Sequence, residues 1–149
     1  MSTKNTPVRT SIPSLPVLDI LDEAGVCFSI KGSNLEFIYQ SKALNKLLGI
    51  AQLYTNDFEI FIPEIAYEIA QEDSLISTSG VAEDVDRILI TKKGKELVVR
   101  IKRSIVNHEG GALLVTIYTD ITKQTQNKQF EAYKKVLTDG EVFEKMLNR

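Results

Sequence analysis

Three β-rich runs in the second half of the chain most restrict its fold. Residues 86–91, 97–106 and 112–119 are rich in β-branched and aromatic side chains, and glycine stands in each break between them. From Leu97 to Ile101 every second residue is apolar and would point to the same face of a strand, which is typical of a strand with one buried face. Because short turns join antiparallel neighbours, the pattern predicts a three-stranded antiparallel meander.

The last of these runs ends abruptly at Asp120. A charged and amide-rich segment follows at residues 123–129, where a helix is expected. A carboxylate at a helix start can accept backbone N–H bonds and is favoured by the positive end of the helix dipole. A strand that passes directly into an exposed helix is better suited to transmitting a change than to catalysis.

The first half of the chain predicts two more strands and several short helices. Residues 26–31 and 35–39 flank a Gly-Ser-Asn turn and predict a hairpin. Ser41 is expected to cap a helix over 42–48, and residues 53–79 predict two further helical pieces. The predicted fold class is therefore α+β, with a five-stranded antiparallel sheet and short helices on one face.

The two ends of the chain are expected to differ from this globular part. Residues 1–13 are polar and hold prolines, which predicts a disordered arm before a domain over 14–122 that opens with a short helix. Residues 123–149 predict C-terminal signalling or dimerisation helices. Gln126, Phe130, Tyr133 and Leu137 are spaced 4-3-4, which fits a dimer contact or a helix folded back on its own sheet. Too few heptads are present for an independent coiled coil. The seam consists of Phe130, Tyr133 and Leu137.

Composition excludes several classes of protein. The 149 residues suit a single domain, and the formal net charge of −2 offers no field for nucleic acid. The single cysteine rules out an intramolecular disulfide and suits a reducing compartment. No run approaches the roughly 18 apolar residues of a membrane span, and residues 1–16 lack the apolar run that a signal peptide needs. We expect a cytoplasmic protein that binds neither nucleic acid nor membrane directly.

Residues 37–49 end in Leu-Gly, Lys-Lys-Gly stands at 92–94, and Asp-Ile-Thr stands at 120–122. In the order of these motifs the chain resembles the PAS family, the sensory module of kinases, cyclases and transcription regulators. Residues 37–49, which end in Leu-Gly, resemble the family's strand-to-helix segment. Lys-Lys-Gly at 92–94 resembles its Lys-Asp-Gly hairpin turn, and Asp-Ile-Thr at 120–122 matches the end of its last strand. The resemblance covers residues 15–122. Ser41 stands where the family often has asparagine, and either residue can cap a helix.

The resemblance implies a cavity between the sheet and the short helices, and a plain hydrophobic core is the competing interpretation. Arg87 would hold an anionic ligand if it projects inward, although a solvated surface arginine is the favoured interpretation. The residues expected around this ligand pocket are Tyr39, Leu44, Leu48, Phe58, Phe61, Ile65, Ile69, Arg87, Leu89, Val99, Leu114 and Tyr118.

The resemblance also implies a signal junction at Asp120 and Thr122, which would tie the last strand to the outgoing helix. Simple capping of that helix, without signalling, is the alternative.

The sequence argues against the cofactors best known in this family. Residues 53–64 lack the cysteine that a covalent flavin requires, and apolar or aromatic side chains replace the flavin-facing amides. His108, the only histidine, is expected in an exposed turn rather than as a haem ligand. Cys27 is expected to be a small buried strand residue. No metal-ligand cluster is present.

Enzymatic activity is not predicted. One histidine and one cysteine cannot supply a catalytic triad and a zinc site together. The acidic run at 68–73 is expected to be a solvated helix face. An enzyme of the cone-shaped α+β barrel type would need a carboxylate or a histidine at the base of its pocket, and the inward candidates include none.

The sequence therefore predicts a PAS-type sensory domain, working as a homodimer. It would sense a small ligand or a partner and transmit through its C-terminal helix to an output domain or partner protein. The alternative is a ligand-free PAS dimerisation or interaction module of a larger regulator, such as a kinase, a diguanylate cyclase or a transcription factor.

Overall fold

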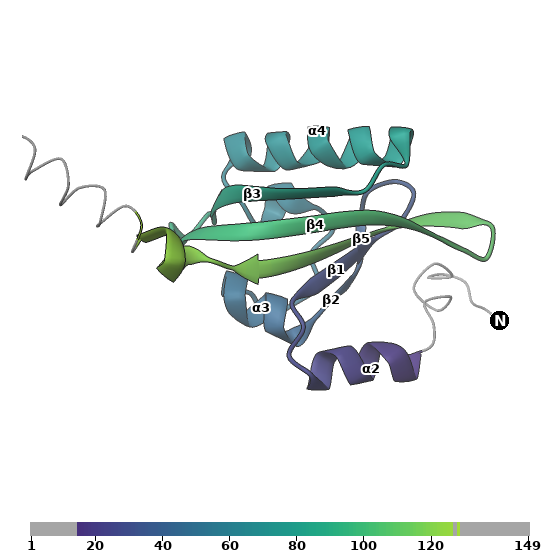
Figure 1. Cartoon of the computed structure of the whole chain (residues 1–149), viewed down its shortest axis with the longest axis horizontal. Helices are drawn as coiled ribbons and strands as arrows, with labels where there is room; N and C mark the ends of the chain where they lie inside the picture. Colours follow the sequence, from purple (N-terminus) through teal and green to yellow (C-terminus); the bar gives the residue numbers. More distant parts are fainter. Residues whose placement is uncertain (1–14, 127, 129–149) are drawn as a thin grey trace, which may run out of the picture.

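The computed structural model describes residues 15–126 and 128 and contains one five-stranded sheet (Figure 1). Its strand order is β2-β1-β5-β4-β3, and all neighbouring strands run antiparallel. The predicted α+β fold is confirmed. The strands are β1 (Phe28–Lys31), β2 (Phe37–Gln40), β3 (Glu83–Ile90), β4 (Glu96–His108) and β5 (Gly111–Asp120).

Helices cover the two faces of the sheet unequally. On one face lie α3 (Lys42–Leu48), the short 3₁₀ turn η1 (Asp57–Glu59) and the long α4 (Pro63–Ser79). Helix α4 runs beside β3 and β4 (Figure 1). The first described helix, α2 (Leu15–Glu23), packs against the other face. None of the described helices combines the length and the apolar character that crossing a bilayer requires.

Ser41 caps α3 as predicted and also fastens the helix to the sheet. Its Oγ accepts the Leu44 N–H at 3.1 Å and the Phe28 N–H of β1 at 2.9 Å. Gly49 ends the helix with φ of 70°, a left-handed conformation that side chains with a Cβ rarely adopt. The segment between β2 and α4 is therefore positioned by local capping chemistry.

The two helical pieces expected over residues 53–79 differ greatly in length. The first is only the η1 turn, which Asn56 and Glu59 close with a capping box. The second is the 17-residue α4, which begins at Pro63, where proline is tolerated because the first N–H has no helical partner. Gly80 ends α4 in the left-handed region.

Apolar side chains form a main core on the α3/α4 face and a smaller core under α2. Leu97, Val99 and Ile101 of β4 are all buried in the main core, which confirms the predicted half-buried strand. Phe28 and Ile30 of β1 form the smaller core with side chains of α2. Strand β1 is buried on both faces because it separates these two cores.

Candidate functional site

A network of buried charges lies between α4, η1 and the inner face of the sheet. Lys31 of β1 and Arg103 of β4 are 2% and 1% exposed, and Asp57 and Asp73 are 4% and 2% exposed. The ammonium of Lys31 contacts Oδ2 of both aspartates. Arg103 donates from Nη1 to Oδ1 of Asp73 at 3.1 Å. Asp73 of α4 therefore bridges two cations that belong to the sheet.

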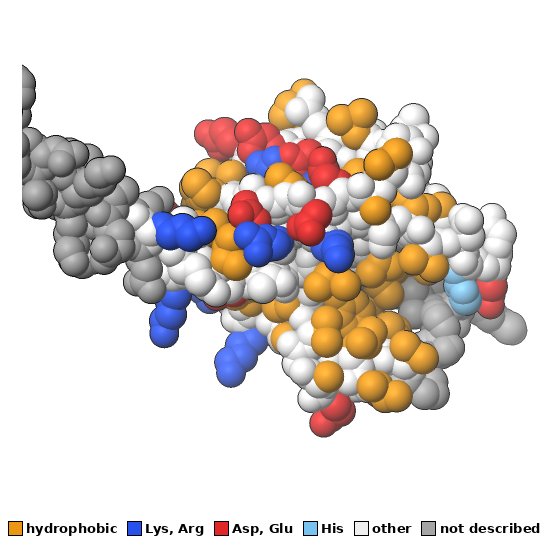
Figure 2. Space-filling model, in the orientation of Figure 1, with side chains coloured by type: hydrophobic (Ala, Val, Ile, Leu, Met, Phe, Trp, Pro, Cys, Tyr) orange, Lys and Arg blue, Asp and Glu red, His pale blue; other side chains and the backbone are white. Residues whose placement is uncertain are grey.

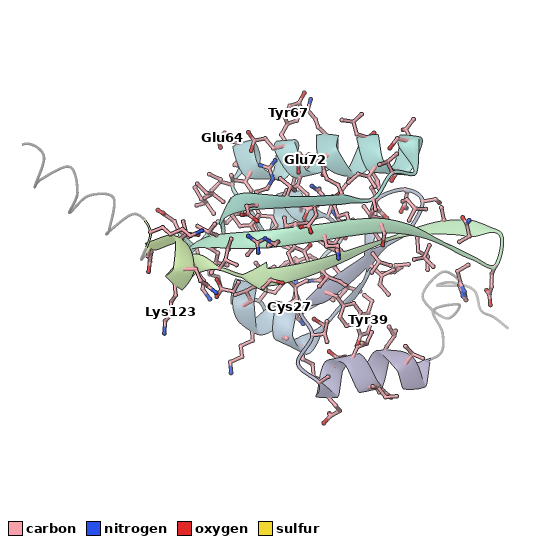
Figure 3. The ribbon with its side chains drawn as sticks, in the orientation of Figure 1. Cys27, Tyr39, Glu64, Tyr67, Glu72 and Lys123 are labelled. Atoms are coloured by element: carbon pink, nitrogen blue, oxygen red, sulfur yellow. The ribbon has the colours of Figure 1, made fainter. Side chains whose placement is uncertain are left out.

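Further carboxylates at the rim of the network neutralise the arginines. Nη2 of Arg103 donates to Glu72 at 2.6 Å and to Glu83 at 2.8 Å. Arg87 of β3 pairs with both Glu68 and Glu72. Glu72 lies on the side of α4 that faces β3 (Figure 3). The acidic side of α4 is thus turned toward the sheet.

Aromatic side chains complete the surroundings of Lys31. Its ammonium lies 4.8 Å from the centre of the Phe37 ring, within the range of a cation–π contact. The Tyr118 hydroxyl and Ser29 Oγ are 3.2 Å apart and share a hydrogen bond on the inner face of the sheet.

Two buried polar atoms of this network have no hydrogen-bond partner among the described residues. They are Oδ1 of Asp57 and Nε of Arg103. An unsatisfied polar atom in a protein interior costs about 1–3 kcal/mol, so native structures rarely keep one without a reason. Asp57 Oδ1 can therefore accept one more hydrogen bond, and Arg103 Nε can donate one more.

Burial shifts the pKa values of the groups in this network. Burial alone would lower the pKa of Lys31, but the charges of Asp57 and Asp73 outweigh it, and the net shift is upward. Burial raises the pKa of Asp57, and Lys31 offsets that rise only in part. Burial also raises the pKa of Tyr118. Lys31 therefore stays charged at neutral pH, whereas burial disfavours the charged form of Asp57.

Most of the predicted pocket residues come together, but they pack against one another. Leu114 is also buried, on the same face of β5 as Tyr118. Ile65 is partly buried against the main core. The predicted residues that share the main core are Leu44, Leu48, Phe61, Ile69, Leu89, Val99 and Tyr118.

Two predicted pocket residues lie elsewhere, which corrects the sequence-based expectation. Tyr39 lies in the smaller core, stacked on Phe28, with its hydroxyl bonded to Asp22 of α2. A bulge in the β1–β2 pairing accompanies this placement. Phe58 is 44% exposed, because the η1 turn directs it away from the core.

The charged residues were assigned wrongly from the sequence. Arg87 is not solvated, since its side chain is 16% exposed and bound by two glutamates of α4. The acidic run at 68–73 is not a solvated face, since Asp73 is buried among cations. The statement that no carboxylate points inward is also wrong, because Asp57 and Asp73 both do.

A signal for this network was present in the hydrophobic periodicity. Asp73 follows Ile69 by four residues and precedes Ile76 by three, so it shares their buried helix face. Arg103 continues the alternating series of buried side chains along β4. Opposite charges on two buried faces indicate an internal ion pair, since an unpaired charge there would be very costly.

Cys27 and His108 lie away from the buried network. Cys27 precedes β1 and is partly buried, and burial followed by the charge of Asp120 raises its thiol pKa to about 11. Such a thiol is protonated and poorly reactive at neutral pH. His108 ends β4 rather than lying within the turn, and its side chain is 31% exposed beside Glu109. The described residues hold no group of three or more metal-ligating side chains.

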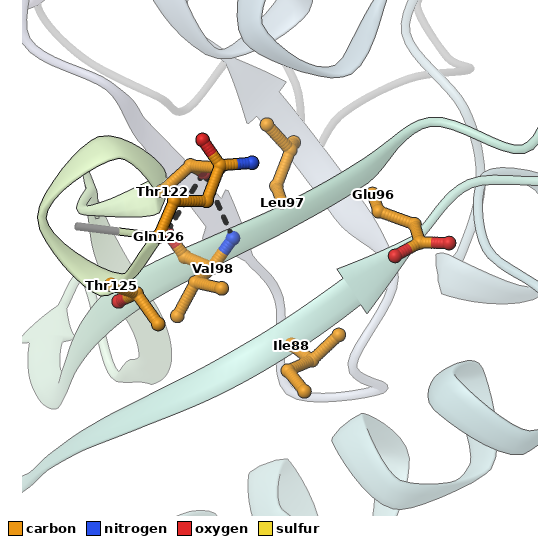
Figure 4. Close-up of a pocket in the computed structure, with 7 residues that line it drawn as sticks. All are labelled: Ile88, Glu96, Leu97, Val98, Thr122, Thr125 and Gln126. Atoms are coloured by element: carbon orange, nitrogen blue, oxygen red, sulfur yellow. Dashed lines mark hydrogen bonds between the residues drawn. The ribbon is translucent and has the colours of Figure 1, made fainter. Parts of the chain in front are cut away.

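The junction after β5 is held by one hydroxyl group with two functions. Oγ1 of Thr122 accepts the Val98 N–H of β4 at 3.0 Å (Figure 4). The same atom lies 2.6 Å from Oδ1 of Asp120, to which it donates. Asp120 also accepts the Thr122 N–H at 3.0 Å. The Ile121 N–H bonds to the Val98 carbonyl at 2.9 Å. These contacts extend the β4–β5 pairing up to the first residue of the helical stretch 122–126.

A pocket of about 150 Å³ lies beside this junction, on the outer side of the sheet (Figure 4). It is lined by Ile88, Glu96, Leu97, Val98, Thr122, Thr125 and Gln126. The predicted output seam at Phe130, Tyr133 and Leu137 and the predicted arm at 1–13 lie outside the described residues.

Comparison with solved structures finds PAS domains. A PAS domain from Colwellia psychrerythraea matches with a TM-score of 0.58 and 19% identity, over 72% of this chain and 96% of that one. The PAS domain of the fruit-fly ELK potassium channel matches with a TM-score of 0.57 and 16% identity, over 79% and 99%. The Vibrio cholerae VqmA dimer matches with a TM-score of 0.62 and 18% identity, over 75% of this chain but only 53% of VqmA.

These similarities show the fold. No protein-family model and no curated protein sequence matches the chain. The structure matches agree with the observed five-stranded sheet and its short helices, so the chain has a PAS-like fold, as the sequence motifs predicted.

Proposed function

We propose that this PAS-like domain is a signalling module that passes a change in its sheet to the segment after Thr122. The observation that supports this proposal is the Thr122 hydroxyl, which binds β4 and Asp120 at once. Because the same atom belongs to both contacts, a shift of β4 relative to β5 alters the start of the following helix. Asp120 and Thr122 are therefore proposed as the signal junction.

The proposed mechanism is a shift of population between a docked and a released junction. In the docked state Val98 N–H and Thr122 Oγ1 are bonded, and residues 122–126 are helical. A ligand or partner that binds one state better shifts the balance by its difference in affinity. The predicted output residues Phe130, Tyr133 and Leu137 would carry the change onward.

Hydrogen exchange of an Asp120→Ala variant tests this relay. We expect the variant to keep the sheet, because Asp120 is exposed, but to lose amide protection over residues 123–137. Asp84→Ala, an exposed carboxylate of β3, serves as the matched control and should leave those amides unchanged. Equal protection in all three proteins would reduce Asp120 to a helix cap and refute the relay.

The domain is further proposed to act as a homodimer. Val17 and Ile20 of α2 are 62% and 66% exposed, and Ile117 of β5 is 40% exposed. Figure 2 shows hydrophobic side chains gathered over α2 and the adjoining strands. Native mass spectrometry should show a dimer that Ile20→Glu weakens. A strict monomer at all accessible concentrations would contradict this part of the proposal.

Sensing of a small molecule is a second candidate function. It is favoured by the two unsatisfied atoms in the buried network, Asp57 Oδ1 and Arg103 Nε. Among the similar structures, VqmA has been solved bound to DPO. The same native mass spectra would reveal a retained compound. A ligand-free module is the alternative, and the close packing of the predicted pocket residues supports it.

A further inference from the structure

The buried cations and the carboxylates that neutralise them come from different layers. Lys31 and Arg103 project from β1 and β4, which the sheet holds in register through β5. Asp73 belongs to α4 and Asp57 to the short η1 turn. The cations are therefore fixed in the sheet, whereas their counter-ions depend on the docking of the helical layer.

Helix α4 turns two carboxylates, Glu72 and Asp73, to the same side as its buried apolar residues. A surface helix normally turns its charged residues to solvent and its apolar residues to the core. Here Glu72 and Asp73 point to the sheet, while Tyr67 and Leu75 are 58% and 69% exposed (Figure 3). Ionic contacts thus account for part of the docking of α4. Buried ion pairs add little net stability, since desolvation offsets their attraction.

The buried network is also incomplete. Nε of Arg103 is a buried donor that finds no partner among the described residues, although both Nη atoms of the same guanidinium are paired. The side chain of Arg103 is 1% exposed, so it lies away from the molecular surface. Three of its bonds go to carboxylates, the groups that a guanidinium binds best.

We propose that Lys31 and Arg103 form a binding site for the carboxylate group of a small ligand, which Asp73 occupies as an internal substitute. A ligand carboxylate can take over both contacts of Asp73, with one oxygen on Lys31 Nζ and the other on Arg103 Nη1. Nε of Arg103 then offers a further donor. Exchange of one carboxylate for another leaves the buried charge unchanged, whereas a neutral or cationic ligand would leave a cation unpaired.

This inference deepens the proposed signalling function. Only the effect of ligand binding on the signal junction rests on that proposed function. Displaced from the cations, Asp73 would carry α4 away from the sheet. Arg103 and Val98 lie on the same strand, so the exchange acts on the strand that holds the signal junction. The binding itself is measurable whether or not the relay exists.

Chemical rescue of an Asp73→Ala variant tests the site. The substitution removes the internal carboxylate and leaves space for a molecule of its size. Acetate at about ten times its dissociation constant should raise the Tm of this variant by about 5 °C over equimolar chloride, and acetamide should not. Asp73→Asn is the matched control, because its amide fills the same space, and acetate should not stabilise it.

Wild-type protein provides a second measurement. Since Asp73 competes with the ligand, the wild type should bind acetate at least about tenfold more weakly than Asp73→Ala. Should Asp73→Ala fail to fold in chloride, its refolding yield in acetate replaces the Tm. Equal responses to acetate and chloride, in Tm or in yield, would overturn the proposal, as would equal acetate affinity of wild type and variant. Hydrogen exchange at residues 123–137 separately reports the relay.

Discussion

Replacing Thr122 with valine removes the hydroxyl that joins β4 to the C-terminal segment and keeps the shape of the side chain. The Val98 N–H loses its acceptor at 3.0 Å, and Asp120 loses a donor at 2.6 Å. Threonine and valine have similar helix propensities, so the helix itself is little affected. The change therefore isolates the two hydrogen bonds.

Their combined contribution follows from the type and exposure of each bond. A neutral hydrogen bond contributes about 1 kcal/mol net, which applies to the partly buried Val98 N–H. The bond to Asp120 is charge-assisted, but the carboxylate is exposed and water can replace the lost donor, so it also contributes about 1 kcal/mol. The sum of about 2 kcal/mol corresponds to about a 30-fold increase in opening of the junction.

Hydrogen exchange resolved to single amides measures that opening. The Val98 and Thr125 amides should lose about 30-fold in protection, since one bonds to Thr122 and the other to Ile121. Thr119→Val, at an exposed position of β5, is the matched control and should change neither amide. A loss of less than about threefold in Thr122→Val would refute the argument that this hydroxyl holds the junction.

Two further predictions concern the core and the buried network. Phe61→Ala should lower the free energy of unfolding by about 3–5 kcal/mol and Phe58→Ala by less than about 1 kcal/mol, because Phe61 is 1% exposed and Phe58 is 44% exposed. If urea unfolding showed similar losses of free energy for Phe61→Ala and Phe58→Ala, the buried position of Phe61 and the exposed position of Phe58 would be contradicted. Because the pKa of Asp57 is raised in the folded state, the folded chain binds more protons than the unfolded chain just above the ordinary carboxyl pKa. The contribution of Asp57 to the free energy of unfolding therefore falls as the pH rises through that window. The free energy of unfolding of wild type relative to Asp57→Asn should therefore be lower at about pH 7 than at about pH 5. If the free energy of unfolding of wild type relative to Asp57→Asn instead rose with pH, Asp57 would belong to an ordinary stabilising ion pair.

Local chemistry made the order and type of the elements predictable from the sequence. Ser41 and Gly49 cap α3 in the structure as their residue types require. The alternation along residues 97–101 placed one face of β4 in the core. Such signals depend on neighbours within a few residues, so a sequence contains them directly.

Long-range pairing explains what the sequence did not reveal. Asp73 and Arg103 are thirty positions apart, and Lys31 and Asp73 are forty-two apart. The acidic run at 68–73 alone suggested a solvated helix face, because charged side chains are rarely buried. Only the fold brings the buried face of α4 against the same face of β4, where the charges neutralise one another. Tyr39 was misplaced for a related reason, since a bulge shifts the pairing between β1 and β2.

Strand β4 connects the two parts of the molecule for which function is proposed. Its inner face presents Arg103 to the carboxylates of α4, and its backbone at Val98 holds Thr122. Both neighbours of β4 are antiparallel strands that pair with it over most of its length, so one strand spans the distance between Arg103 and Val98. Under the proposed mechanism, a change in the docking of α4 would reach the junction as a shift of β4 relative to β5. If Asp73→Ala altered amide protection at residues 123–137 while Asp84→Ala did not, the buried charges and the junction would belong to one coupled system.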